Sequence, residues 1–462
     1  MQDLKHLTRN KRFSGFRSFG FHRSNRRIKD SGELSGLRLP MPVGKRRERL
    51  KHLLLFLAIV LALTPVCALV YQKSPHAVRA VTLWFHSHSA PDIKAAEAAK
   101  PPANGGFETA VRLFDTAVVT DGQLTARNTG GDILHYSIRD DLQKRVHDFM
   151  AQKQVPFGVF VAIEPATGRI LAMTSYSSVD PQWEQSSFFG LYPMASLFKI
   201  ITASAALENK KITPETVVEF RGGPYSENPR YWDISPRGNN NRMDVGYALG
   251  KSINPVYGRV AGDIVGKASV MEYVRKFGFN QSLLPGVPVK ESKAGEPQSG
   301  HALMLMGAGL DHEVKISPLH AAVIMGAIAN QGRMMAPTLT DTVVDAAGGK
   351  KEEHKPRELR RLVSPETAAS LTRMLSNTVT RGTSRRAFHD RRGRPMLAGI
   401  DIAAKTGSID GTDPKGHYSW FAAYAPAHEP RIALVALVIN QDRWKIKSSQ
   451  VGEQALEEFF RK

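Results

Sequence analysis

A long run without charge constrains this chain most strongly, because only a membrane or a protein interior can cover it. Residues Leu53–Gln72 read LLLFLAIVLALTPVCALVYQ and contain no charged side chain. About 20 apolar residues suffice for a helix to cross the hydrocarbon core, and such helices tolerate a proline such as Pro65. The run therefore predicts one transmembrane helix over residues 53–72.

The residues before this run carry much of the chain's positive charge. The formal net charge is +20, and residues 1–52 hold 15 Lys and Arg against four Asp and Glu. The positive-inside rule places this basic tail in the cytoplasm and everything after residue 72 outside the cytoplasmic membrane, in a periplasmic or extracytoplasmic space. Anionic lipid headgroups are the expected partner of the tail. It has no recognisable nucleic-acid-binding fold, so no nucleic-acid partner is expected.

A cleaved signal peptide is the alternative interpretation of the apolar run. Val66-Cys67-Ala68 resembles a cleavage site with small residues, but a basic leader of about fifty residues is too long for a signal peptide. We therefore favour a retained anchor in the cytoplasmic membrane. Cys67 is the only cysteine, so the chain can form neither an intrachain disulfide nor a thiolate metal site.

The remaining chain is predicted to hold one large domain on a short base. Residues 73–106 are rich in Ala, Pro, Ser and Gly and indicate a spacer, whereas short strand-like runs at 107–135 indicate a small pedestal. In the main domain, residues 136–462, apolar strands form a hairpin near each end: 157–164 with 169–176, and 417–425 with 431–440. Helical patterns cover 139–153, most of 196–278, 318–330, 365–380 and 450–461. Strands from both ends can pair into one antiparallel sheet covered by helices, so the fold class is α+β.

Ser196 and Lys199 form the first candidate catalytic pair. They lie one helical turn apart, and Lys199 is the only charged residue between Phe188 and Leu207. An ammonium on a buried helix is desolvated, which lowers its pKa and lets the neutral amine act as a base towards the serine hydroxyl.

Two further motifs follow in the chain. Ser252-Ile253-Asn254 follows a helical stretch, and its hydroxyl and amide can face one pocket, where the serine passes a proton to a leaving amine and Asn254 holds the substrate backbone. Ser226-Glu227-Asn228 has the same spacing but lies in a polar loop that we interpret as surface. Lys405-Thr406-Gly407-Ser408 follows a strand-like run whose edge can pair with an extended peptide, with Lys405 and the two hydroxyls binding a carboxylate and Gly407 allowing close approach.

In this order, Ser-x-x-Lys, Ser-x-Asn and Lys-Thr-Gly resemble the motif set of penicillin-binding proteins and class A β-lactamases. The resemblance to the penicillin-binding transpeptidase domain covers about residues 135–460 and extends beyond the motifs. Segments similar to the family are Tyr136–Gln143, Val159–Met173, Ile316–Gly332 and His417–Pro426. The resemblance implies the penicillin-binding and serine β-lactamase-like transpeptidase fold, with a helical lobe beside the covered sheet, preceded here by one transmembrane helix.

The family's chemistry then implies roles for these residues. Ser196 would attack a D-Ala-D-Ala-type bond of a peptidoglycan stem peptide, with Lys199 as base and the backbone N–H groups of Ser196 and Ser408 stabilising the oxyanion. Ser252, beside Lys405, would protonate the departing D-Ala, and Asn254 would position the acylated peptide. An amine of a neighbouring stem peptide would complete the cross-link. β-Lactams would acylate Ser196 covalently, and no metal or other cofactor is implied.

The chain departs from the family pattern in ways that leave alternatives open. Ala195 stands where members usually have glycine, and the pedestal is shorter than in monofunctional class B members. No glycosyltransferase domain is recognisable, so we expect a short, monofunctional, class B-like enzyme. A D,D-carboxypeptidase, a β-lactamase and a non-catalytic penicillin-binding scaffold or sensor remain alternatives, as does contact with other cell-wall synthesis proteins.

Overall fold

The computed structural model describes residues 105–284 and 286–461. The predicted tail, transmembrane helix and nearly all of the spacer lie outside these residues. Within the described ranges, every helix is too short or too polar to cross a membrane. The described residues all belong to one compact unit, and its elements are given below.

A five-stranded antiparallel sheet forms the centre of this unit, with strand order β14-β15-β16-β4-β5. Its strands are β14 (Ala403–Thr412), β15 (Lys415–Ala425), β16 (Ile432–Asn440), β4 (Phe157–Ile163) and β5 (Ile170–Tyr176). The first and last parts of the domain meet where β16 pairs with β4, from Ala433↔Ile163 to Ile439↔Phe157. This confirms the predicted sheet. Among the described residues, β14 is an edge strand whose outer side pairs with no other strand.

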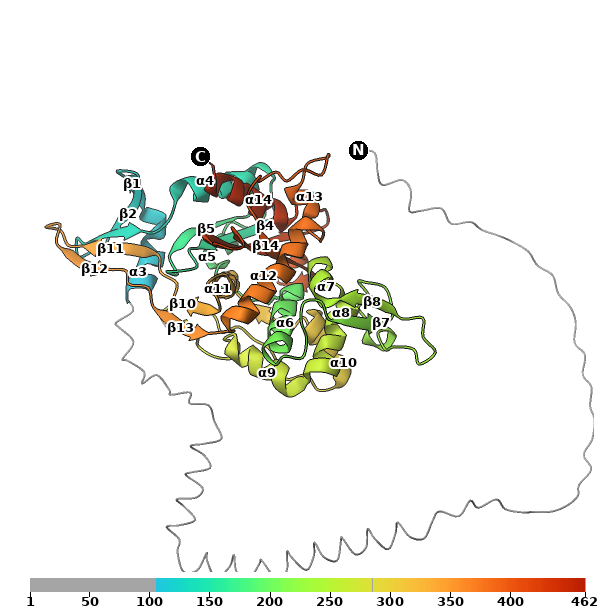
Figure 1. Ribbon diagram of the computed structural model, residues 1–462. Helices are drawn as coiled ribbons and strands as arrows, with labels where there is room; N and C mark the ends of the chain where they lie inside the picture. The colour runs from blue at the N-terminus through green and yellow to red at the C-terminus, as the bar shows by residue number, and fades with distance from the viewer. Residues whose placement is uncertain (1–104, 285, 462) are drawn as a thin grey trace, which may run out of the picture. The chain divides into compact units, whose positions relative to one another are not determined.

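Both faces of the sheet are buried, because successive residues of each strand enter two different cores. On β16, Val435 and Leu437 pack into one core, whereas Leu434 and Ala436 pack into the other. Helices α4 (Asp140–Gln152) and α14 (Ser448–Phe459) cover the second of these faces, and α11 (Pro318–Ala329) and α12 (Pro365–Thr380) lie on the first (Figure 1). A helix that is apolar all round belongs in a protein interior, and α11 is buried along nearly its whole length.

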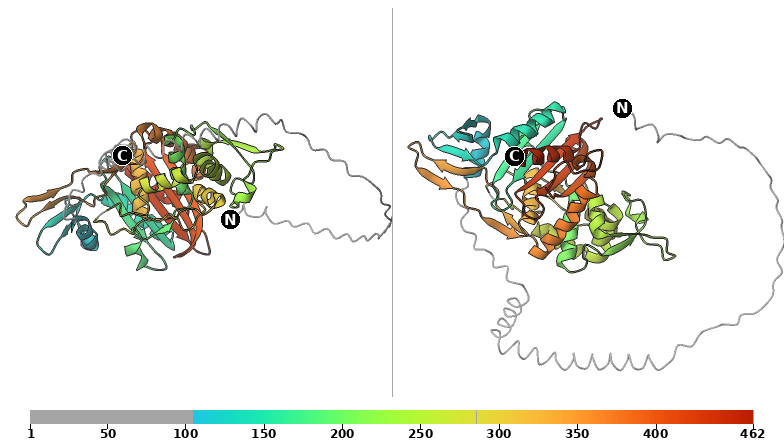
Figure 2. Two further views of the ribbon diagram at one scale, coloured as in Figure 1. Left: turned by 90° about the horizontal axis from the view of Figure 1, so that it is seen from below. Right: turned by 45° about the horizontal axis from the view of Figure 1, so that its top comes forward.

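A helical lobe lies beside this sheet. It comprises α6 (Lys199–Glu208), α7 (Val245–Lys251), α8 (Asn254–Arg259), the π-helix η4 (Val260–Val265), α9 (Lys267–Lys276) and α10 (Gly300–Ala308). Strands β7 (Val217–Phe220) and β8 (Asn241–Asp244) interrupt the lobe as an antiparallel hairpin with a long arm, which projects from it in Figure 2. The helical prediction for 196–278 is therefore wrong over this hairpin.

A second five-stranded sheet combines two distant parts of the chain. Helix α3 (Gly105–Leu113) and the 3-10 turn η1 (Phe114–Thr116) precede β1 (Val118–Thr120), β2 (Gln123–Arg127) and β3 (Ile133–Tyr136). Strand β11 (Thr340–Val344) pairs with β3 and carries β12 (Lys350–Glu353) at the far edge. We call β1-β2-β3-β11-β12 the small sheet; Figure 1 shows it at the opposite end from the helical lobe.

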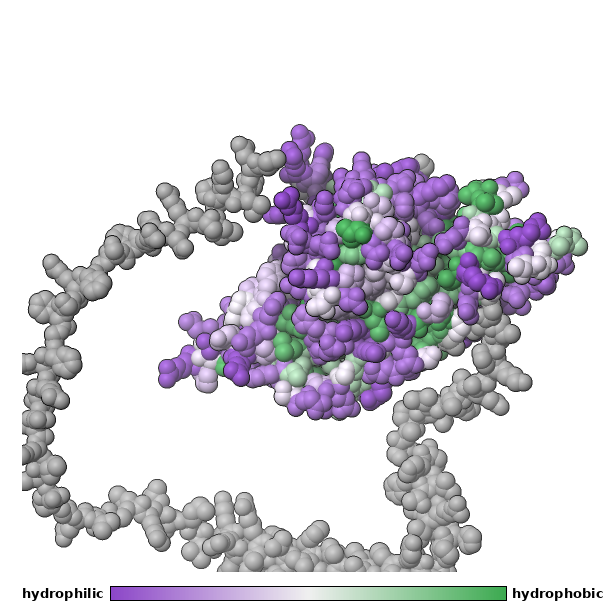
Figure 3. Space-filling model, turned by 180° about the vertical axis from the view of Figure 1, so that it is seen from behind, coloured by the Kyte–Doolittle hydropathy of each residue, from purple (hydrophilic) through white to green (hydrophobic). Residues whose placement is uncertain are grey.

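Seen from behind, this surface is mostly hydrophilic, and its hydrophobic residues gather towards the end that holds the small sheet (Figure 3). Exposed large hydrophobic residues of the small sheet include Val118 and Val119 of the edge strand β1.

The remaining elements are α5 (Trp183–Ser186), β6 (Tyr192–Pro193), η2 (Ala195–Phe198), η3 (Pro229–Tyr231), β9 (Lys315–Ile316), β10 (Arg333–Met335), β13 (Glu358–Arg361) and α13 (Arg385–Phe388).

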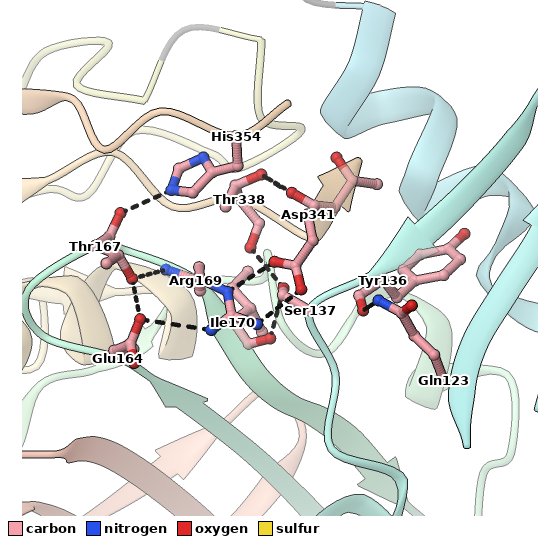
Figure 4. A network of polar contacts seen from close by, with 11 residues as sticks. Gln123, Tyr136, Ser137, Glu164, Thr167, Arg169, Ile170, Thr338, Asp341 and His354 are labelled. Atoms are coloured by element: carbon pink, nitrogen blue, oxygen red, sulfur yellow. Dashed lines mark hydrogen bonds and ion pairs between the residues drawn. The ribbon is translucent and has the colours of Figure 1, made fainter. Parts of the chain in front are cut away.

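A polar network joins the small sheet to the turn between β4 and β5 (Figure 4). Arg169 donates from Nε and Nη2 to the two carboxylate oxygens of Asp341 on β11, both at 2.7 Å. Nη1 of the same guanidinium lies 3.7 Å from Glu164, whose carboxylate also accepts a hydrogen bond from Thr167. The Ser137 hydroxyl donates to the carbonyl of Ile170 at 2.9 Å. A planar guanidinium holds a carboxylate in one orientation, so these contacts fix the small sheet against the central hairpin.

Candidate active site

Ser196 lies on the short 3-10 helix η2, which leads directly into α6. The residue before it, Ala195, has φ +52°, a left-handed conformation that glycine adopts more easily. Neighbouring backbone holds this turn closely. A Cβ on Gly309 would lie 2.2 Å from the carbonyl oxygen of Ala195, and one on Gly407 would lie 3.1 Å from its Cβ. Glycines on two other elements therefore let the segment of Ser196 lie against β14 and the end of α10.

The amine of Lys199 is held by three oxygen atoms. Its Nζ lies 2.7 Å from Ser196 Oγ, 2.8 Å from Asn254 Oδ1 and 2.5 Å from the carbonyl oxygen of Ala308. The Lys199 side chain is fully buried, and no carboxylate is among these three partners. Burial and, second, repulsion from Lys405 hold the pKa of Lys199 well below its usual value.

A neutral Lys199 has two N–H bonds and one lone pair. The amide oxygen of Asn254 and the carbonyl of Ala308 can only accept, so they occupy both N–H bonds. The lone pair is then directed at Ser196, whose hydroxyl can donate its proton to it. The arrangement can therefore activate the serine without a histidine.

Ser252 and Asn254 reach the same site from the junction between α7 and α8. Ser252 ends α7 in a left-handed conformation, with φ +58°, and Asn254 begins α8. The Asn254 backbone N–H donates to the Pro224 carbonyl at 2.9 Å, which ties the junction to the β7–β8 arm. Because of this turn, the side chain of Asn254 meets Lys199 while that of Ser252 meets Lys405.

Lys405 lies on β14 and is fully buried. The Nζ atom of Lys405 lies 2.8 Å from Ser252 Oγ and 2.6 Å from the carbonyl oxygen of the next residue, Thr406. Burial lowers the pKa of Lys405 to about 7. Strand β14 continues through Thr406, Gly407 and Ser408 as far as Thr412, although the polar sequence of residues 409–416 on its own would indicate a loop. From Ser408 to Thr412 the residues of β14 alternate between exposed and half-buried positions, and they lack the apolar pattern by which strands are recognised in a sequence.

The structure therefore brings all three motifs together. Ser196, Lys199 and Asn254 share one set of contacts, Ser252 and Lys405 share another, and Gly407 lies against the backbone of Ser196. The similarly spaced Ser226 and Asn228 have structural roles: Ser226 Oγ accepts from the Trp232 indole, and Asn228 caps η3. Among the described residues, no cluster of His, Cys, Asp or Glu could hold a metal ion.

The motifs did not reveal two groups that complete the site. One is the Ala308 carbonyl, a backbone group that no residue type in the sequence marks. The other is Thr383, just beyond α12, whose hydroxyl lies 2.6 Å from Thr406 Oγ1 and whose N–H donates to the Gly250 carbonyl at 3.1 Å. Thr383 thus connects the helix that precedes Ser252 with the strand that carries Lys405.

Comparison with known proteins identifies the family of this fold. Residues 158–461 match the family model described as the penicillin-binding protein transpeptidase domain. The chain belongs to the penicillin-binding protein transpeptidase family. This confirms the resemblance that the motifs indicated.

Relatives and solved structures agree with this assignment. The chain is 29% identical over 353 residues to peptidoglycan D,D-transpeptidase PbpA of Mycolicibacterium smegmatis, covering 68% of each chain. It is 28% identical over 382 residues to PbpA of Mycobacterium tuberculosis, covering 75% of this chain and 74% of the relative. Penicillin-binding protein A of M. tuberculosis, solved as a ceftriaxone acyl-enzyme complex, superposes with a TM-score of 0.60 at 26% identity over 71% of this chain and 80% of that one. A D,D-transpeptidase domain from Eggerthella lenta shares the fold, with a TM-score of 0.61 at 24% identity, over 77% of this chain and 91% of that one.

Proposed function

We propose that this penicillin-binding protein is an acyl-serine D,D-transpeptidase that cross-links peptidoglycan stem peptides. The observation that carries the proposal is the setting of Lys199, a buried amine whose Nζ lies 2.7 Å from Ser196 Oγ, 2.8 Å from Asn254 Oδ1 and 2.5 Å from the Ala308 carbonyl oxygen. Mycobacterial relatives named peptidoglycan D,D-transpeptidases support the reaction class.

In the first step, Ser196 Oγ attacks the carbonyl of a D-Ala-D-Ala-type bond and its proton passes to Lys199. The backbone N–H groups of Ser196 and Ser408 stabilise the oxyanion, an effect typically worth about 3–4 kcal/mol. As the C–N bond breaks, Ser252 protonates the departing D-Ala amine and recovers a proton from Lys405, 2.8 Å away. Lys405, with the hydroxyls of Thr406 and Ser408, binds the substrate carboxylate.

In the second step, an amine from a neighbouring stem peptide attacks the acyl-serine. The proton of this amine passes through Ser252 to Lys405, which regains the proton it gave up in the first step. Lys199 returns its proton to Ser196 Oγ as the ester bond breaks, and a new amide joins the two peptides. Asn254 positions the acylated peptide, and Gly407 allows the strand edge to approach it. β-Lactams enter the first step as covalent inhibitors.

Labelling with a fluorescent penicillin tests the nucleophile and the base. We expect one covalently labelled band from the wild type, none from Ser196→Ala, and strongly slowed acylation of Lys199→Ala. Label that survives Ser196→Ala would refute the assignment of the nucleophile. An unlabelled wild type would instead favour a non-catalytic scaffold, and rapid loss of the label would favour a β-lactamase. Product analysis of a stem peptide with and without an acceptor amine separates cross-linking from carboxypeptidase hydrolysis.

We also propose that residues 53–72 anchor the chain in the cytoplasmic membrane, with residues 1–52 in the cytoplasm. Residues 73–106 and 107–135 would serve as spacer and pedestal for a catalytic domain outside the membrane, where other cell-wall synthesis proteins can meet it. The uncharged run and the basic residues before it support this topology. Protease treatment of spheroplasts tests it: digestion should reach residues 136–462 and spare an N-terminal tag.

A further inference from the structure

The arm between β7 and β8, residues 221–240, adjoins the active site. The Pro224 carbonyl on this arm accepts the backbone N–H of Asn254 at 2.9 Å. Glu227, also on the arm, lines a cavity together with Ser408 of β14. The arm therefore touches the second motif and shares a cavity with the strand of the third, although it carries none of the proposed catalytic side chains. It projects outward from the helical lobe (Figure 2).

A buried tryptophan holds the arm in place. Trp232 is fully buried and packs with Met304 and Ala308 of α10. The indole N–H of Trp232 donates to Ser226 Oγ at 3.1 Å, which joins the two halves of the arm. Because the Ala308 carbonyl also holds Lys199, the arm is fixed to the same helix as the proposed catalytic amine. The arm is thus a firm support for the side chains that it presents.

Three large side chains of the arm are exposed to solvent. Tyr225 is 61% exposed, Tyr231 is 66% exposed and Ile234 is 43% exposed. Ser226 and Trp232 directly follow the two tyrosines in the chain, so the hydrogen bond between them brings both tyrosines to one region of the arm. Tyrosine offers a large, rigid contact area at a low cost in conformational entropy. The arm therefore presents a pair of rings that can bind a ligand without rearrangement.

The other exposed side chains of this hairpin are mostly polar. They include Arg230, Arg237, Asn239 and Asn241. Residues Val217–Asp244 contain four arginines and no lysine, and tyrosine and arginine are enriched on recognition surfaces whereas lysine is depleted. Since the rings occur among polar groups, the surface fits a hydrophilic ligand with apolar faces better than the apolar core of a permanent protein partner.

A sugar chain has this chemistry. One face of a pyranose ring carries C–H groups that stack on an aromatic ring, and its hydroxyl and N-acetyl groups form hydrogen bonds with amides and guanidinium groups. In the proposed reaction, the stem peptide that reaches Ser196 is attached to a glycan strand of such sugars. An extended peptide spans at most about 3.3–3.6 Å per residue, so the short stem keeps its sugars near the active site, where the arm projects.

We propose that Tyr225 and Tyr231 bind the glycan strand of the substrate by stacking on its N-acetylated sugars. Arginine and asparagine side chains of the arm bind the polar groups of the same sugars. The inference rests on the proposed function, and it extends the recognised substrate from a stem peptide to a stem peptide on its glycan. It makes the arm a binding surface that a free peptide cannot use.

Two substrates with the same stem peptide test the proposal, one free and one linked to a tetrasaccharide of the glycan strand. The full chain in detergent micelles is assayed for release of D-Ala, and the measured quantity is the ratio of the two second-order rate constants, linked over free, on the same enzyme. We expect a ratio above one for the wild type. A stacked aromatic ring changes such a rate about twofold to tenfold, so the ratio should fall by that factor in Tyr225→Ala and in Tyr231→Ala. Tyr231→Phe, which keeps the ring, should retain most of the ratio.

Met396→Ala is the matched control, because Met396 is 52% exposed but lies beyond α13, outside the arm. It should leave the ratio at the wild-type value. A wild-type ratio of one, a ratio that survives alanine at both tyrosines, or an equal loss in Met396→Ala would overturn the inference. Fluorescent penicillin is applied in parallel: a labelled Ser196 without any glycan preference overturns the inference alone. Absence of both label and D-Ala release would refute the proposed function, and the inference with it.

Discussion

Ala195 is a buried residue with an unfavourable backbone conformation. Its φ of +52° costs a non-glycine residue roughly 1–2 kcal/mol. Ala203 on α6 is equally suitable for comparison, because it is also buried and has ordinary helical neighbours. Both Ala→Gly changes remove one buried methyl group and raise the conformational entropy of the unfolded chain. Only the change at Ala195 also removes the cost of holding a non-glycine residue in a left-handed conformation.

We therefore expect Ala195→Gly to be more stable than Ala203→Gly by about 1–2 kcal/mol, as measured by urea unfolding. Acylation of Ala195→Gly by penicillin should continue, because Ser196 and Lys199 are unchanged. Equal losses of stability in the two variants would show that the turn before Ser196 carries no conformational cost.

Lys405 makes stability depend on pH in a defined direction. Its pKa is about 7 in the folded chain, whereas an unfolded lysine titrates near 10.4. The cost of burying the ammonium is fully present below pH 7 and is relieved as the pH rises above that value. Between pH 7 and 9 the unfolded state binds more protons, so the free energy of unfolding should rise with pH.

The variant Lys405→Met should remove this contribution. Urea unfolding at pH 7, 8 and 9 should give the wild type a slope that exceeds that of the variant by up to about 1.4 kcal/mol per pH unit. Lys350→Met, at an exposed position of β12, should keep the wild-type slope. Parallel slopes for wild type and Lys405→Met would contradict the lowered pKa.

At the scale of elements, the end of α12 connects two of the motifs. Thr383 reaches the Gly250 carbonyl with its N–H and Thr406 Oγ1 with its hydroxyl. Thr383→Val keeps the shape of the side chain but leaves the Thr406 hydroxyl free to turn. Since a hydrogen bond of this kind contributes about 0.5–1.5 kcal/mol, acylation should slow about twofold to tenfold. Thr383→Ser should restore the rate.

Thr380→Val is the matched control for this change, because its hydroxyl bonds only within α12. The loss in Thr383→Val should appear mainly as weaker binding before acylation, since Thr406 is proposed to hold the substrate carboxylate. A normal rate in Thr383→Val, or a loss that Thr383→Ser does not repair, would exclude this positioning role.

The strands that the sequence predicts correctly contain long apolar runs, and the strands that it misses do not. The hairpins β4–β5 and β15–β16 bury apolar side chains on both faces, so long apolar runs indicated them. In the hairpin β7–β8, exposed and buried residues alternate along β7, whereas every residue of β8 is exposed or half-buried. With the polar arm between the two strands, no apolar run identifies this hairpin. In the active site, the motifs in the sequence identified Ser196, Lys199, Ser252, Asn254 and Lys405. They could not identify the Ala308 carbonyl or the hydrogen bond between Thr383 and Thr406, because those groups come close to the motifs only in the folded chain.

At the scale of the whole described unit, Arg169 and Asp341 hold the small sheet to the central hairpin. Both side chains are partly buried, and the guanidinium uses two N–H groups. Asp341→Ala should lower the free energy of unfolding by about 1.5–3 kcal/mol, because it removes the acceptor of two charge-assisted hydrogen bonds of the guanidinium. The exposed pair of Lys350 and Glu353 gives the control: Lys350→Ala should change stability by less than about 1 kcal/mol. Equal effects of the two changes would show that the network in Figure 4 does not fasten the small sheet.

The small sheet also sets an order of events during synthesis. Strands β1–β3 leave the ribosome first, but their partners β11 and β12 follow only after more than 200 further residues. Until then β3 presents an unpaired edge, which is a site for wrong strand pairing. The family match begins at residue 158, so a fragment cut there would keep β11 and β12 but lose the strand that pairs with them. An expressed catalytic domain should therefore begin before α3. A fragment that begins at residue 158 lacks β3 and leaves the edge of β11 unpaired, so that it can pair with strands of other molecules and aggregate.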